Sequence, residues 1–166
     1  MSLTLTHAER DQLIERYAAG PQRLREALAR VPPEAMQWRP APGKWSPHEV
    51  ACHCADSETC AAVRIRYVLA ERQPRIDGYD QDEWARGFDY HAQPLDLALA
   101  TVDALRAQTT ALLRRLPEAV WEREGTHNEH GRYTAEDWLR IYAAHLEGHA
   151  QQIDRVVAAW KAAQGV

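Results

Sequence analysis

The sequence has no apolar run that approaches the length of a membrane span, and it has no segment in which Lys and Arg are concentrated. The first lack argues against a membrane protein. The second, together with a formal net charge of −4, argues against a protein that binds nucleic acid through phosphate contacts. The initial stretch MSLTLTHAERD has neither a basic start nor an apolar centre, so we expect no signal peptide. We therefore expect a soluble cytoplasmic protein.

Cysteine is scarce, with three residues, Cys52, Cys54 and Cys60, all within nine positions. An odd number in such a chain argues against a framework of disulfides. On a helix, Cys52 and Cys54 would lie about 200° apart, so they could not chelate one ion together. We interpret these residues as small buried thiols, with a redox or ligand role as the alternative.

Proline and glycine, nine and eight residues respectively, fall mainly into three groups near positions 32–47, 74–94 and 117–131. The four segments between these groups show the apolar periodicity of helices. No segment shows sustained alternation with β-branched residues, and there is no internal repeat. We therefore predict an all-α fold, a four-helix bundle, with residues 1–166 as a single domain.

Three capping boxes predict where helices begin, since each pairs a Ser or Thr with an acidic residue three positions later. One further helix lacks a box and is expected to begin near Pro94. Pro21 lies inside the first helical segment, so we expect a kink or a break there. The boxes begin at Thr6, Ser46 and Thr134, with Glu9, Glu49 and Asp137 as their partners.

The connection from about 73 to 93 is long for a compact domain, and loops of that length tend to be functional or to carry short structure of their own. It contains DGYDQDEWARGFDY, which is rich in aromatic and acidic residues. This composition suits a lid or rim over a site. Tyr79, Asp80 and Trp84 are candidate substrate-binding residues on that rim, with simple loop packing as the alternative.

The stretch HLEGHAQQI places His145 and His149 one helical turn apart. Both continue the apolar stripe that runs from Tyr142 to Ile153, so both rings should point into the bundle. Burial lowers the pKa of a histidine and favours the neutral form that binds metal. The alternative is a pair of core histidines that are hydrogen-bonded to other side chains.

A third histidine, His53, should face inward from the second helix. Three inward imidazoles on two helices fit a catalytic zinc-type site with an open fourth position. The order His-Leu-Glu-Gly-His is not the zincin motif, because Glu147 should point about 200° away from the first histidine, and this disfavours a peptidase. The predicted buried stripe of the second helix is Val50, His53, Ser57, Ala61, Arg64 and Val68.

Two charged residues of the second helix are candidate catalytic residues. Asp56 lies one turn after His53, where it could orient that imidazole or act as a base. Arg64 could pair with Asp56 or Asp80, or bind a substrate carboxylate, and a purely structural ion pair is the alternative. His130, in the predicted loop before the last helix, is a further candidate for substrate binding, with hydrogen bonding inside the loop as the alternative.

Several segments resemble, in order, the DinB/YfiT-like metalloenzymes, and the YfiT branch most closely. The resemblance extends over nearly the whole chain and implies a four-helix bundle of unusual connectivity, often a homodimer. It also implies one divalent ion, Zn²⁺ or Ni²⁺, held by His53, His145 and His149. The segments are KWSPHEVACHCADSE, RIRYVLAE, YDQDEW and HNEHGRYTAEDWLRIYAAHLEGHAQQI.

The resemblance leaves the reaction open, because some members of this family are called metal-dependent hydrolases and others are S-transferases that use bacillithiol or a related thiol. An ion with three neutral ligands keeps its full charge and can lower the pKa of a bound water to about 7, or ionise a bound thiol. We therefore predict a thiol S-transferase that acts on a small electrophile. A hydrolase and a non-catalytic metal-binding stress-response module are the alternatives.

Overall fold

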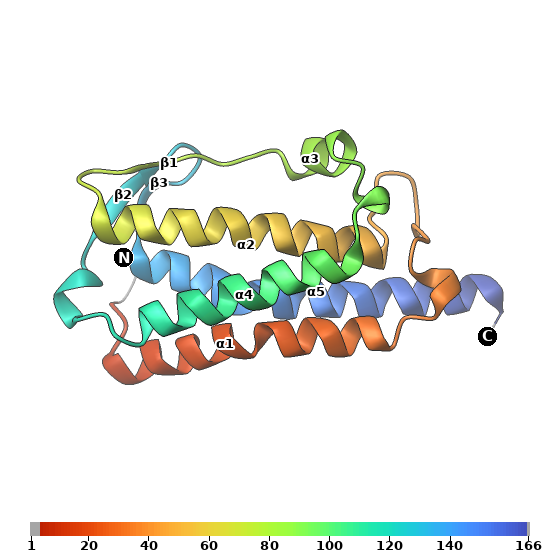
Figure 1. The fold of residues 1–166 in the computed structure, drawn as a ribbon, viewed down its shortest axis with the longest axis horizontal. Helices are drawn as coiled ribbons and strands as arrows, with labels where there is room; N and C mark the ends of the chain where they lie inside the picture. Colours follow the sequence, from red (N-terminus) through yellow and green to blue (C-terminus); the bar gives the residue numbers. More distant parts are fainter. Residues whose placement is uncertain (1–3, 166) are drawn as a thin grey trace.

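The structure, a computed structural model, describes residues 4–165, and in these residues four long helices lie side by side along one axis (Figure 1). The predicted all-α four-helix bundle is therefore confirmed. None of the described helices is long and apolar enough to cross a membrane. The long helices are α1 (His7–Ala29), α2 (Pro47–Ala70), α4 (Leu95–Leu113) and α5 (Ala135–Gln164).

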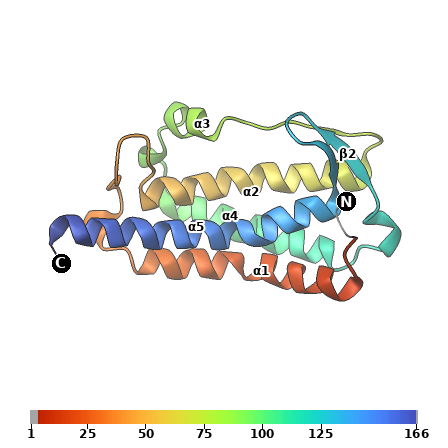
Figure 2. The same cartoon turned by 180° about the vertical axis from the view of Figure 1, so that it is seen from behind.

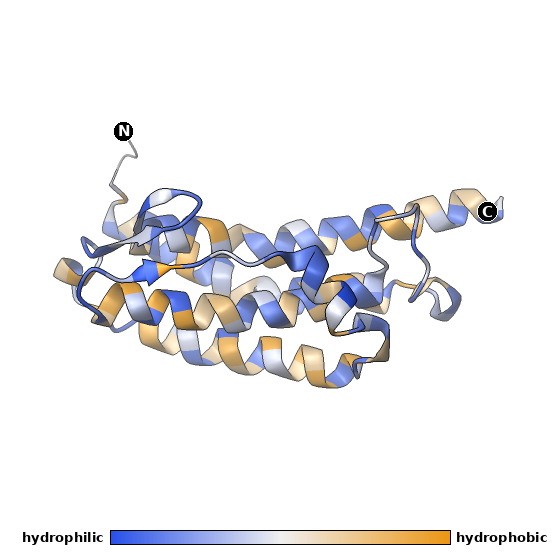
Figure 3. Cartoon of the chain, turned by 90° about the horizontal axis from the view of Figure 1, so that it is seen from above, coloured by the Kyte–Doolittle hydropathy of each residue, from blue (hydrophilic) through white to orange (hydrophobic). Residues whose placement is uncertain are grey.

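The connectivity explains the long connection in the middle of the chain. In Figure 1, α1 and α5 run from left to right, whereas α2 and α4 both run from right to left. Because α2 and α4 are parallel neighbours, the chain has to travel back along the whole of α2 before α4 can begin. This returning segment, residues 71–94, carries the short helix α3 (Gln81–Gly87) and is mostly hydrophilic along its length (Figure 3).

A small three-stranded sheet, which the sequence pattern did not predict, lies at one end of the bundle (Figures 1 and 2). Its strand order is β1-β2-β3, with β1 parallel to β2 and β2 antiparallel to β3. A Cβ atom at Gly125 would lie 2.6 Å from the carbonyl oxygen of Pro74, so only glycine allows the backbone at position 125 to approach the backbone at Pro74 this closely. The strands are β1 (Arg75–Ile76), β2 (Glu124–His127) and β3 (Gly131–Thr134).

The three expected capping boxes are all present, at Thr6, Ser46 and Thr134. In each of them the side-chain oxygen accepts a hydrogen bond from a backbone N–H three residues later, and the acidic partner accepts one from the backbone N–H of the capping residue. The break that was considered at Pro21 is absent, because α1 continues through it. Tyr17 and Leu24 are fully buried on either side of the proline, so packing holds both halves of α1 against the bundle.

Two apolar clusters make up the core, one toward each end of the bundle. On α2 the change from one cluster to the other falls between Ala55 and Ala61, and on α5 it falls between Ala143 and Leu146. The predicted site residue His145 lies at this boundary. The core is therefore polar in its middle, where the candidate site is found.

Candidate metal site

The structure brings together the three histidines that the sequence singled out. The Nε2 atoms of His145 and His149 are 3.2 Å apart, and the ring centroid of His53 lies 5.6 Å and 4.8 Å from those of His145 and His149. Each residue offers one ring nitrogen, and the three nitrogens lie within 4.8 Å of one another. Two nitrogens bound to one tetrahedral zinc at about 2.05 Å are about 3.3 Å apart. The arrangement therefore has the dimensions of a metal site.

Burial keeps the three rings neutral. It lowers the pKa of His53 to about 3, with a smaller contribution from His149, and it lowers the pKa of His145 and of His149 as well. A neutral imidazole has one N–H group and one lone pair, so each ring can offer a metal a lone pair without first losing a proton. Electrostatically, the site is prepared to receive a cation.

The hydrogen bonds of His149 fix which of its nitrogens is free. Its Nδ1 lies 2.8 Å from Oε1 of Gln152, and because that oxygen only accepts, Nδ1 is the atom that carries the hydrogen. The lone pair is then on Nε2, which faces His145. In the other two rings, Nδ1 of His53 and of His145 is buried without a hydrogen-bond partner among the described residues. Buried polar atoms without partners are rare in proteins, and these two adjoin the site.

Sequence reasoning missed Glu58, the carboxylate that lies nearest to the histidines. Its Oε1 atom is 3.9 Å from Nδ1 of His145, and its side chain is completely buried. It accepts hydrogen bonds from Arg106 at 2.6 Å and from the hydroxyl of Tyr17 at 3.2 Å. Because Glu58 lies one turn after Cys54, it could have indicated that a wider face of α2 is buried. Its partner Arg106 lies on α4, however, so the sequence of α2 alone does not reveal the ion pair.

Asp56, the residue predicted to serve the histidines, has a different partner. It accepts a hydrogen bond of 2.6 Å from the hydroxyl of Tyr90, which lies in the short 3-10 helix Tyr90–Ala92. It is not among the residues that line the cavity beside the histidines. Asp56 therefore ties the returning segment to α2.

A cavity of about 210 Å³ opens beside the histidines. The predicted residues Arg64, Tyr79 and His130 line it, together with His53 and His145. The walls come from α2, α5, the returning segment and the β2–β3 hairpin, so the sheet has a direct role in the site. The remaining lining residues are Ser57, Gly78, Gln81, His127, Glu129, Ile141 and Tyr142.

The other two predicted rim residues lie outside this cavity. Asp80 is the N-cap of α3, where its side chain accepts hydrogen bonds from the backbone N–H groups of Asp82 and Glu83. Trp84 packs against Tyr79 with ring centroids 4.3 Å apart. Both residues shape the segment that holds Tyr79 in place.

Arg64 does not make the ion pair that was considered with Asp56 or Asp80. It donates to the hydroxyl of Tyr142 at 3.0 Å and to the carbonyl oxygen of Asp77 at 2.7 Å. Its guanidinium also lies 5.6 Å from the ring centroid of Tyr79. Both hydrogen-bond acceptors are neutral.

His127 and His130 belong to the hairpin, where His127 is the last residue of β2 and His130 lies in the turn before β3. Their rings are stacked with centroids 4.6 Å apart. Nδ1 of His127 accepts the backbone N–H of Glu129 at 3.1 Å. The two histidines and Glu129 also bring possible ligand atoms within 4.8 Å of one another, but His130 and Glu129 are exposed.

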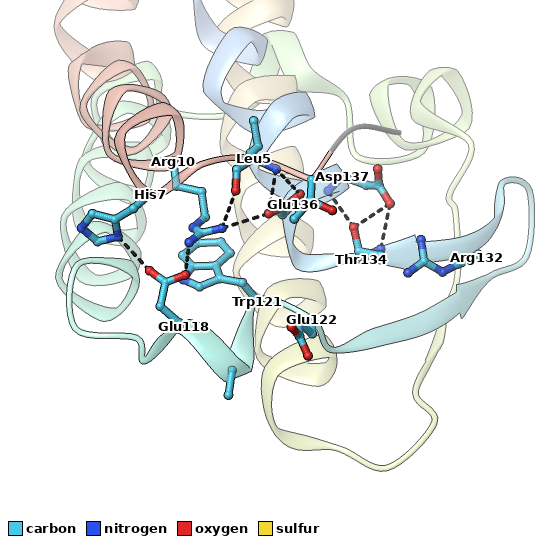
Figure 4. Close-up of a pocket in the computed structure, with 12 residues that line it drawn as sticks. Leu5, His7, Arg10, Glu118, Trp121, Glu122, Arg132, Thr134, Glu136 and Asp137 are labelled. Atoms are coloured by element: carbon cyan, nitrogen blue, oxygen red, sulfur yellow. Dashed lines mark hydrogen bonds and ion pairs between the residues drawn. The ribbon is translucent and has the colours of Figure 1, made fainter. Parts of the chain in front are cut away.

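A larger cavity of about 740 Å³ lies near the beginnings of α1 and α5 and the end of β3, and it contains none of the predicted site residues (Figure 4). Arg10 crosses it and bonds to Glu118, to Glu136 and to the carbonyl oxygen of Leu5. The backbone N–H of Leu5 in turn donates to Glu136. These groups satisfy one another, so the region fastens the N-terminal segment to α5.

The cysteines have the surroundings of inert thiols. Burial raises the pKa of Cys52 to about 12 and that of Cys54 well above its usual value. The Cys52 thiol donates to the carbonyl oxygen of Tyr90 at 3.5 Å. Because the reactive form of cysteine is the thiolate, these shifts support the interpretation as small buried thiols.

Comparisons with known proteins identify relatives of this chain. A "Putative metal-dependent hydrolase" of Oceanobacillus iheyensis is 34% identical over 111 residues, which is 67% of this chain and 64% of that relative. The "Putative metal-dependent hydrolase YfiT" of Bacillus subtilis is 26% identical over 151 residues, 90% of this chain and 85% of that protein.

Two solved structures share the fold. The structure of YfiT, described as "a probable metal-dependent hydrolase with an unusual four-helix bundle topology", matches with a TM-score of 0.87 at 24% identity, over 99% of this chain and 93% of that chain. A mutant of a mycothiol-dependent maleylpyruvate isomerase matches with a TM-score of 0.70 at 12% identity, over 91% of this chain and 63% of that chain. The family model described as "DinB superfamily" matches residues 16–153, and the chain therefore belongs to the DinB superfamily.

Proposed function

We propose that this protein is a metal-dependent S-transferase that joins a low-molecular-weight thiol, bacillithiol or a relative of it, to a small electrophile. The observation that carries the proposal is the convergence of three neutral imidazoles, with Nε2 of His145 and of His149 3.2 Å apart. Zn²⁺ and Ni²⁺ both suit imidazole ligands. The names of the relatives as metal-dependent hydrolases support metal dependence, and His53, His145 and His149 are the proposed ligands.

A divalent ion bound there would supply Lewis acidity, which lowers the pKa of a coordinated thiol or water. The protein provides the setting for that chemistry. Burial keeps the histidines neutral and leaves the cation its full charge, and Gln152 orients His149. The small cavity beside the histidines is open to solvent and accommodates a small molecule.

The placement of the two acidic residues of α2 near the histidines supports thiol transfer more than hydrolysis. Hydrolysis requires a general base within reach of the attacking water. Asp56 is bonded to Tyr90, and Glu58 is paired with Arg106 in the core, so neither reaches the cavity. A thiol is more acidic than water, so it needs less help to ionise. The fold shared with a mycothiol-dependent isomerase also supports chemistry with a small thiol.

Hydrolysis is the second candidate, because the relatives are named hydrolases and because Glu129 and His130 lie on the cavity wall. Either residue could serve as the base that hydrolysis needs. A role as a non-catalytic metal-binding module is the third candidate.

One panel of assays separates the three. Protein loaded with Zn²⁺ or Ni²⁺ is offered monobromobimane with bacillithiol, glutathione or cysteine, and separately ester and amide substrates without thiol. We expect thiol-dependent turnover that is lost in His149→Ala and kept in His7→Ala, because His7 is exposed and bonds to Asp11 and Glu118 instead. Turnover without thiol would replace the proposal with hydrolysis, and inactivity in every assay would leave the non-catalytic module.

The native metal is identified by elemental analysis of protein purified without a nickel column. We expect about one divalent ion per chain, with zinc or nickel as the element found. A protein that contains no metal, and that takes none up from solution, would contradict the proposal regardless of the assay results.

A further inference from the structure

Arg64 differs from the arginines in the interior of the bundle in having no anionic partner. Arg106, which is 1% exposed, pairs with Glu58, and Arg10, which is 5% exposed, pairs with Glu118 and Glu136. Arg64 is partly buried, and among the described residues it forms no ion pair with a carboxylate. Its two hydrogen bonds go to a tyrosine hydroxyl and a backbone carbonyl oxygen.

No carboxylate in the neighbourhood forms an ion pair with Arg64 among the described residues. Asp56 accepts from Tyr90, and Asp80 caps α3. Asp77 offers Arg64 its backbone oxygen. Glu129 lines the same cavity, but its side chain is exposed and lies against Gly78, where an added Cβ would be 2.7 Å from the carboxylate. The protein therefore holds a guanidinium at the cavity without neutralising it.

Tyr142 connects this cation with the proposed metal site. Its hydroxyl accepts from Arg64 at 3.0 Å, and its ring centroid lies 5.6 Å from that of His145. Arg64, Tyr142 and His145 all line the one small cavity. A molecule bound there meets the guanidinium at one place and the histidines at another, so one small ligand can contact both.

We propose that Arg64 binds a carboxylate of the substrate, and that the site selects small molecules carrying both a group that coordinates the metal and a carboxylate. The guanidinium has N–H groups in a planar fork that suits a carboxylate, and Tyr142 and Asp77 hold it in place. Arg64 is thus a residue that determines specificity. The inference rests on the proposed function in that the carboxylate belongs to the substrate of that site.

Binding of two thiols to zinc-loaded protein, followed by calorimetry, tests this role. The probes are 3-mercaptopropanoate and its neutral counterpart 2-mercaptoethanol. The measured quantity is the ratio of their affinities, because a metal ion also attracts carboxylates and would favour the first probe by itself. We expect Arg64→Gln, which keeps a hydrogen-bond donor and removes the charge, to reduce this ratio about tenfold.

Arg66→Met is the matched control. Arg66 lies two residues further along α2 and also donates only to neutral acceptors, the carbonyl oxygen of Ala62 and Oε1 of Gln108, but it does not line the cavity. Arg66→Met should leave the ratio of the two affinities unchanged. Arg64→Lys should show a ratio between that of the original protein and that of Arg64→Gln. If circular dichroism shows that Arg64→Gln does not fold, the Lys variant still tests the inference. The ammonium group of Lys cannot make the paired hydrogen bonds of a guanidinium to a carboxylate, so the affinity ratio should still fall. A ratio that stays the same in folded variants of Arg64 overturns the inference.

A second arm separates the carboxylate site from the proposed chemistry. Propanoate and 1-propanol, which lack a thiol, are compared on metal-free protein by ligand-observed NMR. Binding of propanoate that depends on Arg64 would support the anion site even if no thiol transfer were found. If the thiols bind and react but neither carboxylate probe responds to Arg64, the proposed function stands and this inference falls.

The same probes show which substrate carries the carboxylate. If it belongs to the thiol, Arg64→Gln raises the KM for a carboxylated thiol and leaves that for monobromobimane unchanged. If it belongs to the electrophile, the KM of a carboxylated electrophile such as iodoacetate rises instead. An unchanged KM for both would also overturn the inference.

Discussion

Two polar clusters occupy the middle of this bundle, and they meet at His145. One consists of Glu58, Arg106 and Tyr17, in which the buried charges are opposite and hydrogen-bonded to each other. The other consists of the three histidines, in which the rings are neutral and two buried nitrogens have no hydrogen-bond partner among the described residues. In the first cluster each formal charge has its counter-charge within the chain, whereas the second consists of three neutral rings that converge on one point.

The two clusters differ in where their buried polar atoms find hydrogen-bond partners. Burying a polar atom without a partner is unfavourable, so folded proteins normally provide the partner from their own chain. The chain does this for the two terminal nitrogens of Arg106, which donate to Glu58 and to the carbonyl oxygens of Tyr17 and Tyr142, and within the described part of the chain it leaves only Nε without a partner. In the same residues it leaves Nδ1 of His53 and of His145 without a partner, whereas Nε2 of His145 has Ser57 and His149 within hydrogen-bond distance. The first cluster should therefore govern stability and the second metal binding, and the following experiments test this separation.

The largest effect is expected from Arg106→Met. It leaves the carboxylate of Glu58 buried without its counter-charge, and breaking a buried pair from one side costs about 3–5 kcal/mol. Urea denaturation of metal-free protein measures this loss. The double variant Glu58→Leu with Arg106→Met should recover most of it, because no charge is then left in the core. A single variant as stable as the original protein would show that the pair is not essential.

The next largest effect is expected from His149→Ala on metal affinity. Loss of a residue that merely orients a ligand costs about 10–100-fold, so loss of a ligand should reduce affinity for Zn²⁺ by at least about 100-fold. Competition with a chromophoric chelator measures the affinity. His7→Ala is the control, since His7 is exposed and lies outside the cluster. Equal Zn²⁺ affinity in the two variants would show that His149 is not a metal ligand.

Glu58→Gln tests whether the two clusters communicate. Glu58 lies 3.9 Å from Nδ1 of His145, so the carboxylate can orient this ring when the metal is bound. We expect a decrease in Zn²⁺ affinity of about tenfold, at the lower end for such partners. Asp56→Asn is the matched control, because Asp56 lies two residues away on α2 and bonds to Tyr90. If both variants bind Zn²⁺ like the original protein, the clusters are independent.

The smallest effect is expected from Ser46→Ala, a change outside both clusters. The Ser46 side chain accepts the backbone N–H of Glu49 at the start of α2, and removing such a cap costs about 1 kcal/mol. Urea denaturation should show this loss while Zn²⁺ affinity stays constant. A parallel loss of affinity would mean that the start of α2 also sets the position of His53.

The sequence was informative where structure depends on neighbours along the chain. Capping boxes act within three residues, so the starts of α1, α2 and α5 could be predicted. Helical periodicity placed His145 and His149 on one inward face, and the same reasoning placed His53 inward on α2. These inferences used only the spacing of residues within one helix.

The sequence was silent where structure depends on distant segments. Each strand of the sheet has two to four residues, and β1 pairs with β2 across about 50 residues of chain, so no alternating pattern could reveal it. Glu58 was missed in favour of Asp56 for a similar reason. Its partner Arg106 lies on α4, and nothing in α2 alone tells which of the two acids faces that helix.

The sheet divides the site into two independently supported parts. The proposed metal ligands are fixed by α2 and α5, whereas His127, Glu129 and His130 are carried by a hairpin that is tied to β1. Changes in the hairpin can therefore alter which molecules enter without disturbing the ligands. Such modularity means that residues of the hairpin and residues of the two helices can be substituted independently of each other.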